Sequence, residues 1–156
     1  MTRINNNINP NKLCDQMLIA EHREIVRVCS LLEQRISMMK TDELKYIPYY
    51  YQKPDGVYVF KTLFWLDKGK FTLERYRTIY NECKRRGINV TDYSSSWDIY
   101  KRHPRYFNDY TPTTIQNNIM VDRIIQKIKV MKRTPRYNRR DSSKVEMITK
   151  LTNGTM

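Results

Sequence analysis

A threonine follows the initiator methionine, and a glutamate, Glu24, lies between two arginines in the stretch AEHREIVRV some twenty residues later. We expect Met1 to be removed because the next residue is small, which would leave Thr2 with a free α-amine. The intrinsic pKa of an α-amino group is about 8, against about 10.4 for lysine, so part of the amine is unprotonated at neutral pH. Nearby arginines would lower that pKa further. An amine of this kind forms imines with sugar carbons, although a Met-Thr start alone is compatible with any protein.

The charge of the chain indicates a polyanionic partner. The 156 residues carry 29 Lys and Arg against 16 Asp and Glu, a net charge of +13, and 12% of the residues are aromatic. Nucleic acid, an anionic membrane surface and an acidic protein all fit this charge. The sequence has no run of about 18 apolar residues and no signal peptide pattern. We therefore expect neither membrane insertion nor secretion, but a cytoplasmic protein.

The residues that commonly hold metals or nucleotide cofactors are scattered. Cys14, Cys29 and Cys83 lie far apart in helical stretches, which indicates reduced core thiols. His22 and His103 are not paired, and the four glycines form no phosphate-binding loop. We expect no metal and no cofactor.

The run from Lys12 to Arg35 contains neither glycine nor proline and predicts the first helix. Its apolar residues fall on one broad arc at 100° per residue; they are Leu13, Cys14, Met17, Leu18, Ile25, Val28, Cys29, Leu31 and Leu32. Glu24 lies at the edge of this arc, where we expect it to be partly exposed, with Gln16, Arg23 and Arg27 on the polar flank. Glu21 lies nearer the middle, where we expect a buried structural carboxylate held by an arginine, since unpaired burial would cost several kcal/mol.

Two more helices are predicted further along the chain. One runs from about Lys70 to Arg86 and stops at Gly87, and the other follows Thr113. The expected inward residues are Phe71, Tyr76, Ile79, Tyr80 and Cys83 in the former, and Ile115, Ile119, Ile124, Ile125 and Ile128 in the latter. Between the first two helices, residues 45–65 are expected to be irregular extended chain. After Met131 the apolar period fades into KRTPRYNRRDSS.

These patterns predict a mainly α protein, a single compact three-helix domain with long irregular connections. We expect a domain over residues 1–133 and a basic, mobile tail over 134–156. Tryptophans 65 and 97 and tyrosines 49–51 could stack on bases, but we expect Trp65 to be a core residue because its neighbours are apolar. His103 is expected in a loop.

Several short stretches resemble, in order, the phage endonuclease V family of pyrimidine-dimer DNA glycosylase/AP lyases. The resemblance is strong over the first 28 residues and sparse between 40 and 63. The matching residues are Thr2-Arg3-Ile4-Asn5, Asp15-Gln16, Ala20-Glu21, Arg23-Glu24, Arg27, Val28, Phe64, Asp67-Lys68, Glu82-Cys83, Arg86-Gly87, Asn89, Asp109-Tyr110, Pro112, Arg123 and Lys127-Ile128.

The resemblance implies that the amine of Thr2 attacks C1′ of the damaged nucleotide's sugar, displaces the base and forms an imine. It implies that Glu24 stabilises the cationic transition state and assists proton removal at C2′, so that β-elimination cuts the strand. The substrate would be double-stranded DNA with damaged or abasic nucleotides, bound by a monomer with its N-terminus at the active site, and the gene would be viral. The expected DNA-binding residues are Arg3, Gln16, Arg23, Arg27, Arg123, Lys127 and Tyr137.

Two departures from the family pattern bear on function. Met17 stands where the family has a histidine, and the family's aromatic C-terminal tail is replaced by Arg136-Tyr137-Asn138-Arg139-Arg140 and an added segment. We therefore expect a blunted preference for pyrimidine dimers. Residues 141–156 should contribute little to catalysis, because their composition offers no core to dock against. An AP lyase, a glycosylase for another lesion, and a non-catalytic nucleic-acid-binding protein on the same fold remain alternatives.

Overall fold

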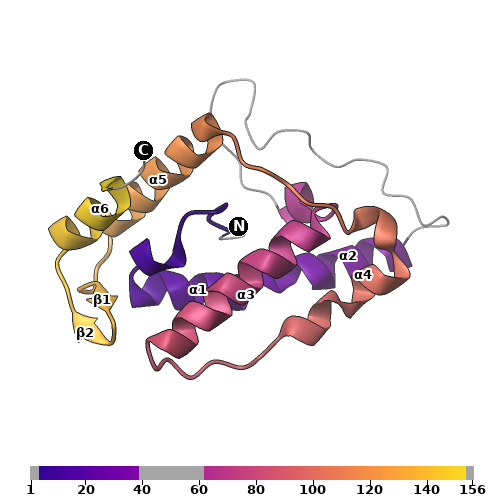
Figure 1. Cartoon of the computed structure of the whole chain (residues 1–156), viewed down its shortest axis with the longest axis horizontal. Helices are drawn as coiled ribbons and strands as arrows, with labels where there is room; N and C mark the ends of the chain where they lie inside the picture. The colour runs from indigo at the N-terminus through magenta and orange to yellow at the C-terminus, as the bar shows by residue number, and fades with distance from the viewer. Residues whose placement is uncertain (1–3, 39–61, 154–156) are drawn as a thin grey trace. The chain divides into compact units, whose positions relative to one another are not determined.

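The computed structural model describes residues 4–38 and 62–153, and these are mainly helical (Figure 1). The mainly α class is therefore confirmed. Residues 1–3, 39–61 and 154–156 lie outside the described part, together with Thr2, Arg3 and the tyrosines at 49–51. The elements are η1 (Pro10–Lys12), α1 (Asp15–Ile25), α2 (Arg27–Ser37), η2 (Thr62–Trp65), α3 (Gly69–Arg85), η3 (Ser94–Asp98), α4 (Ile99–Arg102), η4 (Pro104–Tyr106), α5 (Thr114–Lys129), β1 (Arg136–Tyr137), β2 (Arg140–Asp141) and α6 (Lys144–Thr152).

The first predicted helix is present as two helices, α1 and α2, that follow each other almost without interruption. It begins later than predicted, because Pro10–Lys12 forms a separate 3₁₀ turn. The break falls at Val26, which keeps right-handed helical angles (φ −63°, ψ −22°). Ile25 and Val26 are adjacent β-branched residues, whose stiff side chains lower helix propensity. The lower helix propensity of these two residues therefore interrupts the helical hydrogen bonds, while the chain keeps its direction.

The other two predicted helices match α3 and α5. Gly87 ends α3 with a positive φ of 71°, and the N–H of Ile88 donates to the carbonyl of Cys83 at 2.9 Å, as in a Schellman turn. Thr113 caps α5, and its hydroxyl and the side chain of Gln116 form a complete capping box. Ile115, predicted to face inward, is 68% exposed. That prediction is wrong because the buried face of α5 begins one turn later, at Met120, Ile124 and Ile128.

The described residues cluster into two compact units. The first contains Ile4, 23–38, 62–77 and 92–110, and the second contains 5–22, 78–91 and 111–153. In the first unit, α2 packs against η2 and η3, and α4 packs against η3 and η4. Its core is aromatic: the Trp65 ring stacks on Phe71 at 5.5 Å between centroids, and Tyr110 contacts both rings edge-on. Trp65 is fully buried, so its predicted core role is confirmed.

Two further contacts fix the first unit around its aromatic core. The indole N–H of Trp97 donates to the hydroxyl of Thr72 at 3.0 Å, and the hydroxyl of Tyr100 donates to the carbonyl of Leu66 at 2.9 Å. The Tyr100 ring lies so close to Gly69 that a Cβ there would be 2.5 Å from it. Only glycine therefore fits at the start of α3.

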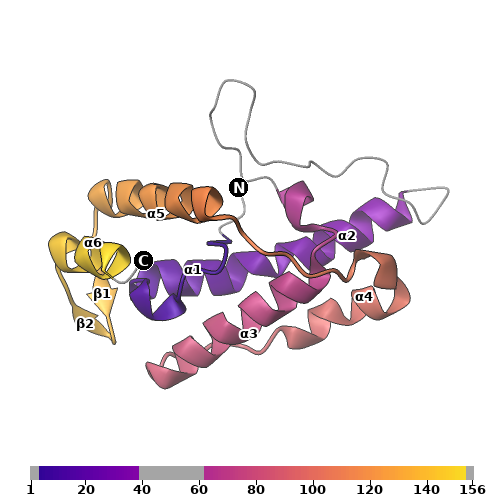
Figure 2. The same cartoon turned by 45° about the horizontal axis from the view of Figure 1, so that its top comes forward.

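In the second unit α6 lies beside α5, as Figures 1 and 2 both show, and also contacts η1. Met147 and Leu151 of α6 are fully buried, and the ammonium of Lys144 donates to the carbonyl of Lys129 at 2.9 Å. The expectation that the C-terminal segment has nothing to dock against is therefore wrong for residues 144–152. Met147, Ile148 and Leu151 have the spacing of one helix face, although the residues just before this segment are basic and polar. The predicted functional boundary at residue 133 stays a prediction.

Candidate active site and nucleic-acid interface

The chain that precedes α1 is held by a buried carboxylate. The main-chain N–H of Asn5 donates to Oε2 of Glu21 at 3.3 Å, and the side-chain Nδ2 of Asn5 donates to Oε1 at 2.6 Å. Both residues are buried, Glu21 completely, and so is the neighbouring Ile4. The predicted burial of Glu21 is thus confirmed, and Asn5 is one of its donors. Hydrogen bonds to a charged acceptor in a dry environment are stronger than neutral ones, so the start of the described chain is firmly attached to α1.

Glu24 lies on α1, three residues after Glu21, and is only 8% exposed. We expected a partly exposed carboxylate at the edge of the apolar arc, and the structure corrects that expectation. Its Oε2 atom is inaccessible to solvent. A carboxylate removed from water acts on a developing positive charge more strongly than an exposed one, because the effective dielectric constant around it is lower.

The two arginines beside Glu24 differ from it in solvent exposure. Arg23 and Arg27 are exposed, although the residues next to them on the chain, Glu24 and Val28, are buried. Their spacing of four residues places them on one side of the helical course. Exposed guanidinium groups are suited to bind phosphate oxygens in pairs of hydrogen bonds. The end of α1 and the start of α2 thus combine a buried carboxylate with two accessible cations.

Arg123 and Lys127 share one face of α5, and both side chains are half-buried. The two terminal nitrogens of Arg123 are inaccessible to solvent. A phosphate arriving from solvent would therefore not reach these nitrogens without a movement of the side chain. The predicted phosphate contacts of both residues stay predictions, and burial favours Lys127 over Arg123.

Gln16 and Tyr137 were predicted to bind DNA, and their polar atoms contact the protein itself. The amide of Gln16 donates to the carbonyl of Thr134 at 2.8 Å and accepts from the N–H of Arg136 at 2.9 Å. The hydroxyl of Tyr137 donates to the carbonyl of Asn11 at 2.7 Å. The Tyr137 ring has the guanidinium carbon of Arg86 and the ammonium of Lys150 each 4.3 Å from its centroid. These contacts give both residues a role in holding the β1–β2 hairpin.

A buried ion pair that sequence reasoning missed supports this arrangement. The guanidinium of Arg86 donates to Oδ1 of Asp15 at 2.9 Å, and both side chains are nearly inaccessible. Arg86 also donates to the carbonyls of Leu13 and Pro10 and, through Nε, to Glu82. Arg86 and Asp15 both stood among the residues that resemble the family, but their mutual contact joins positions 71 apart in the sequence. The pair fixes the start of α1 to the end of α3.

The cysteines do not supply an alternative nucleophile. All three thiols are free and buried. Burial raises the pKa of Cys29 to about 12 and that of Cys83 to about 11, and it also raises the pKa of Cys14. A thiol attacks as the thiolate, so these groups are poorly suited to nucleophilic catalysis at neutral pH.

Two further features, a metal-binding cluster and a membrane-spanning helix, are absent from the described residues. No group of three or more histidine, cysteine or acidic side chains there could hold a metal ion. Among the same residues, no helix combines the length and the apolar character needed to cross a lipid bilayer.

No solved structure matches the chain. A family model described as pyrimidine dimer DNA glycosylase matches residues 1–95, which include Glu24 and its flanking arginines as well as the hydrogen bonds of Asn5 and of Arg86 described above. Because this match covers more than half of the sequence, the chain belongs to the pyrimidine dimer DNA glycosylase family.

Proposed function

We propose that the protein removes damaged bases from double-stranded DNA and then cuts the strand at the resulting abasic site, with the α-amine of Thr2 as nucleophile and Glu24 as its carboxylate partner. The amine forms a bond to C1′ of the sugar while the glycosidic bond breaks and the base departs. The product is a ring-opened imine between the protein and the sugar. Removal of a C2′ proton then expels the 3′ phosphate oxygen by β-elimination, and water releases the sugar.

The attachment of Asn5 to Glu21 is the observation that carries this proposal. Thr2 precedes Asn5 by three residues, and three fully extended residues span at most about 11 Å. Glu24 follows Glu21 on the same helix by about 4.5 Å of axial rise. The length of the chain therefore permits the amine to reach the Glu24 carboxylate. Family membership adds that the substrate is damaged DNA.

The low exposure of Glu24 supports its proposed role. The sugar gains positive charge as the base leaves, and a fixed carboxylate in a partly dry site stabilises that charge. The same carboxylate is suited to accept the C2′ proton as a general base. The exposed Arg23 and Arg27 would hold the flanking phosphates, which positions the strand without reading its sequence.

Substitution of Glu24 by glutamine tests this function. The two side chains have the same shape, so Glu24→Gln should fold and bind damaged duplex DNA while base excision falls by about 100-fold or more, the scale of a lost general base. Glu33→Gln, on the exposed face of α2, removes the same charge and serves as a matched control with unchanged excision. Wild-type excision by Glu24→Gln would contradict the proposal.

A second candidate, an AP lyase with little preference for pyrimidine dimers, is favoured by the contacts of Tyr137. This residue is the aromatic that remains where the family has an aromatic tail, and its hydroxyl and ring contact Asn11, Arg86 and Lys150. An aromatic ring that already has these contacts within the protein contributes little to binding a lesion. Cleavage of dimer-containing duplex compared with abasic duplex at equal salt decides between the two candidates. Equal rates would favour the glycosylase with lyase activity, and cleavage of abasic duplex alone would favour the lyase.

A further inference from the structure

The β1–β2 hairpin has an arginine in a backbone conformation that arginine rarely adopts. Arg136 pairs with Asp141 and Tyr137 with Arg140, and the two residues of the turn, Asn138 and Arg139, have φ values of 52° and 67°. Such turns favour Asn followed by Gly, because both residues have positive φ. An arginine at the second position is strained, because its Cβ lies close to the following carbonyl oxygen, and this strain costs free energy. This cost suggests that the side chain of Arg139 has a use outside the turn.

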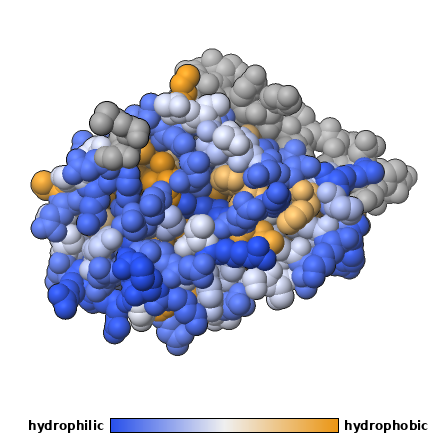
Figure 3. Space-filling model, viewed as in Figure 1, coloured by the Kyte–Doolittle hydropathy of each residue, from blue (hydrophilic) through white to orange (hydrophobic). Residues whose placement is uncertain are grey.

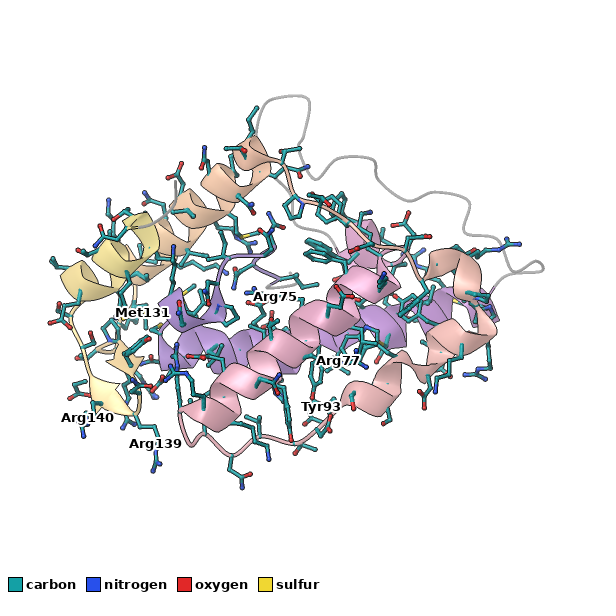
Figure 4. The ribbon with its side chains drawn as sticks, in the orientation of Figure 1. Arg75, Arg77, Tyr93, Met131, Arg139 and Arg140 are labelled. Atoms are coloured by element: carbon teal, nitrogen blue, oxygen red, sulfur yellow. The ribbon has the colours of Figure 1, made fainter. Side chains whose placement is uncertain are left out.

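Contacts with α1 and within the hairpin hold the turn in this conformation. The N–H of Arg139 donates to Oδ2 of Asp15 at 2.7 Å, and the guanidinium of Arg136 donates to the carbonyl of Arg139 at 2.6 Å. Gln16 holds the chain on both sides of Pro135, as described above. Figure 4 shows Arg139 and Arg140 on this hairpin. The hairpin therefore presents its arginines from a fixed backbone.

A pocket of the second unit lies between the hairpin and the end of α3. Its lining contains three arginines, Arg133, Arg136 and Arg139, and two aspartates, Asp15 and Asp141. Arg86 already neutralises Asp15, so the arginines give the pocket an excess of positive charge. Gly87 leaves room for the Arg139 guanidinium, because a Cβ there would lie 3.1 Å from its Nη1.

The arginines around this pocket carry charge that the described residues do not neutralise. Arg133, Arg136, Arg139 and Arg140 are all exposed, and none forms an ion pair with a carboxylate of residues 4–38 or 62–153. In Figure 3 the surface over the hairpin is mainly hydrophilic. Four like charges on one short segment repel each other, and bound phosphates would remove that repulsion.

We propose that the hairpin, with Arg133 beside it, binds the phosphodiester backbone of duplex DNA and forms an anchor separate from Thr2 and Glu24. Guanidinium groups grip phosphate oxygens without reading bases, so this anchor acts on undamaged DNA as well as on damaged DNA. The inference rests on the proposed function only in taking DNA as the ligand.

The test uses Arg133→Ala/Arg140→Ala in the full chain and a fluorescent undamaged 20-base-pair duplex. These two side chains donate no hydrogen bond within the described residues, so the hairpin should remain folded. Because each phosphate contact contributes about −0.9 to the slope of log K against log salt, the slope should flatten by about 1.8. The matched control Arg133→Lys/Arg140→Lys keeps both charges and should keep the slope. Arg77→Ala/Arg102→Ala, at two other exposed arginines, controls for net charge and should change the slope by less than about 0.5.

An unchanged slope, or an equal change in the Arg77/Arg102 variant, would overturn the proposal. A larger loss of affinity for single-stranded RNA than for duplex DNA would also overturn it. Should the double variant unfold, Arg140→Glu alone should still flatten the slope by at least about one contact. The duplex is undamaged, so the salt dependence of binding does not depend on catalysis. A wild-type protein that excises no damaged base would contradict the proposed function, and the test of the hairpin would still be valid.

Discussion

Asn5 and Glu21 are joined by two hydrogen bonds, one from the main chain at 3.3 Å and one from the side chain at 2.6 Å. Asn5→Ala removes the shorter of the two from a fully buried carboxylate, and we expect a loss of about 1–3 kcal/mol in the free energy of unfolding. Base excision should fall as well, because the residues ahead of Asn5 lose their attachment to α1. Urea denaturation and excision assays check both effects. Asn7→Ala, at an exposed neighbouring position, is the matched control, and equal stability of the two variants would contradict the role given to Asn5.

Helix α6 should be an integral part of the fold. Leu151→Ala and Met147→Ala each remove a fully buried side chain, and we expect each to cost about 2–5 kcal/mol. Val145→Ala on the same helix, where the side chain is 74% exposed, should stay within about 0.5 kcal/mol of the wild type. Thermal and urea denaturation of the three variants provide the comparison. Wild-type stability of the Leu151 variant would show that α6 does not dock in solution.

Gln16 should act on the hairpin more than on DNA. Gln16→Ala removes both hydrogen bonds that its amide makes with the backbone of residues 134 and 136. We expect the amide of Arg136 to exchange with solvent at least about 10-fold faster, which corresponds to the roughly 1–1.5 kcal/mol of one hydrogen bond. Hydrogen exchange followed by NMR measures this rate. If exchange were unchanged while affinity for DNA fell, the original prediction of direct DNA binding would be the better one.

The three thiols should be protected in the native protein. Because burial raises the pKa of Cys29 to about 12 and of Cys83 to about 11, the reactive thiolate is scarce at pH 8. A thiol reagent in excess should label none of the three within minutes, and all three after denaturation in urea. Rapid labelling of the native protein would mean that the cores around these residues open easily. Quantification by mass spectrometry distinguishes the three sites.

The sequence predicted most strongly what depends on local patterns. Gly87 and Thr113 marked helix ends because their cap chemistry is local, and the apolar period located α3 and α5. Contacts between distant positions could not be predicted in this way. The Arg86–Asp15 pair and the use of Gln16 by the hairpin join segments 71 and 118–120 residues apart, and no local pattern encodes such a partner.

The exposure of individual side chains was predicted less well than the helices that carry them. Glu24 was expected at a partly exposed edge and is buried, whereas Ile115 was expected inside and is exposed. Helical periodicity gives the direction in which a side chain points on its helix. It does not tell which neighbouring segment packs against that face of the helix, and this packing decides whether the side chain is buried.

The site of covalent attachment to DNA tests the proposed mechanism most directly. Protein that begins at Thr2 would be incubated with abasic duplex DNA and borohydride, which reduces an imine to a stable amine, and the adduct digested and mapped by mass spectrometry. The mechanism predicts that the DNA remnant lies on the α-amine of Thr2, and that protein with Met1 retained by design gives no adduct. Attachment to a lysine, or full trapping by the protein that retains Met1, would contradict it.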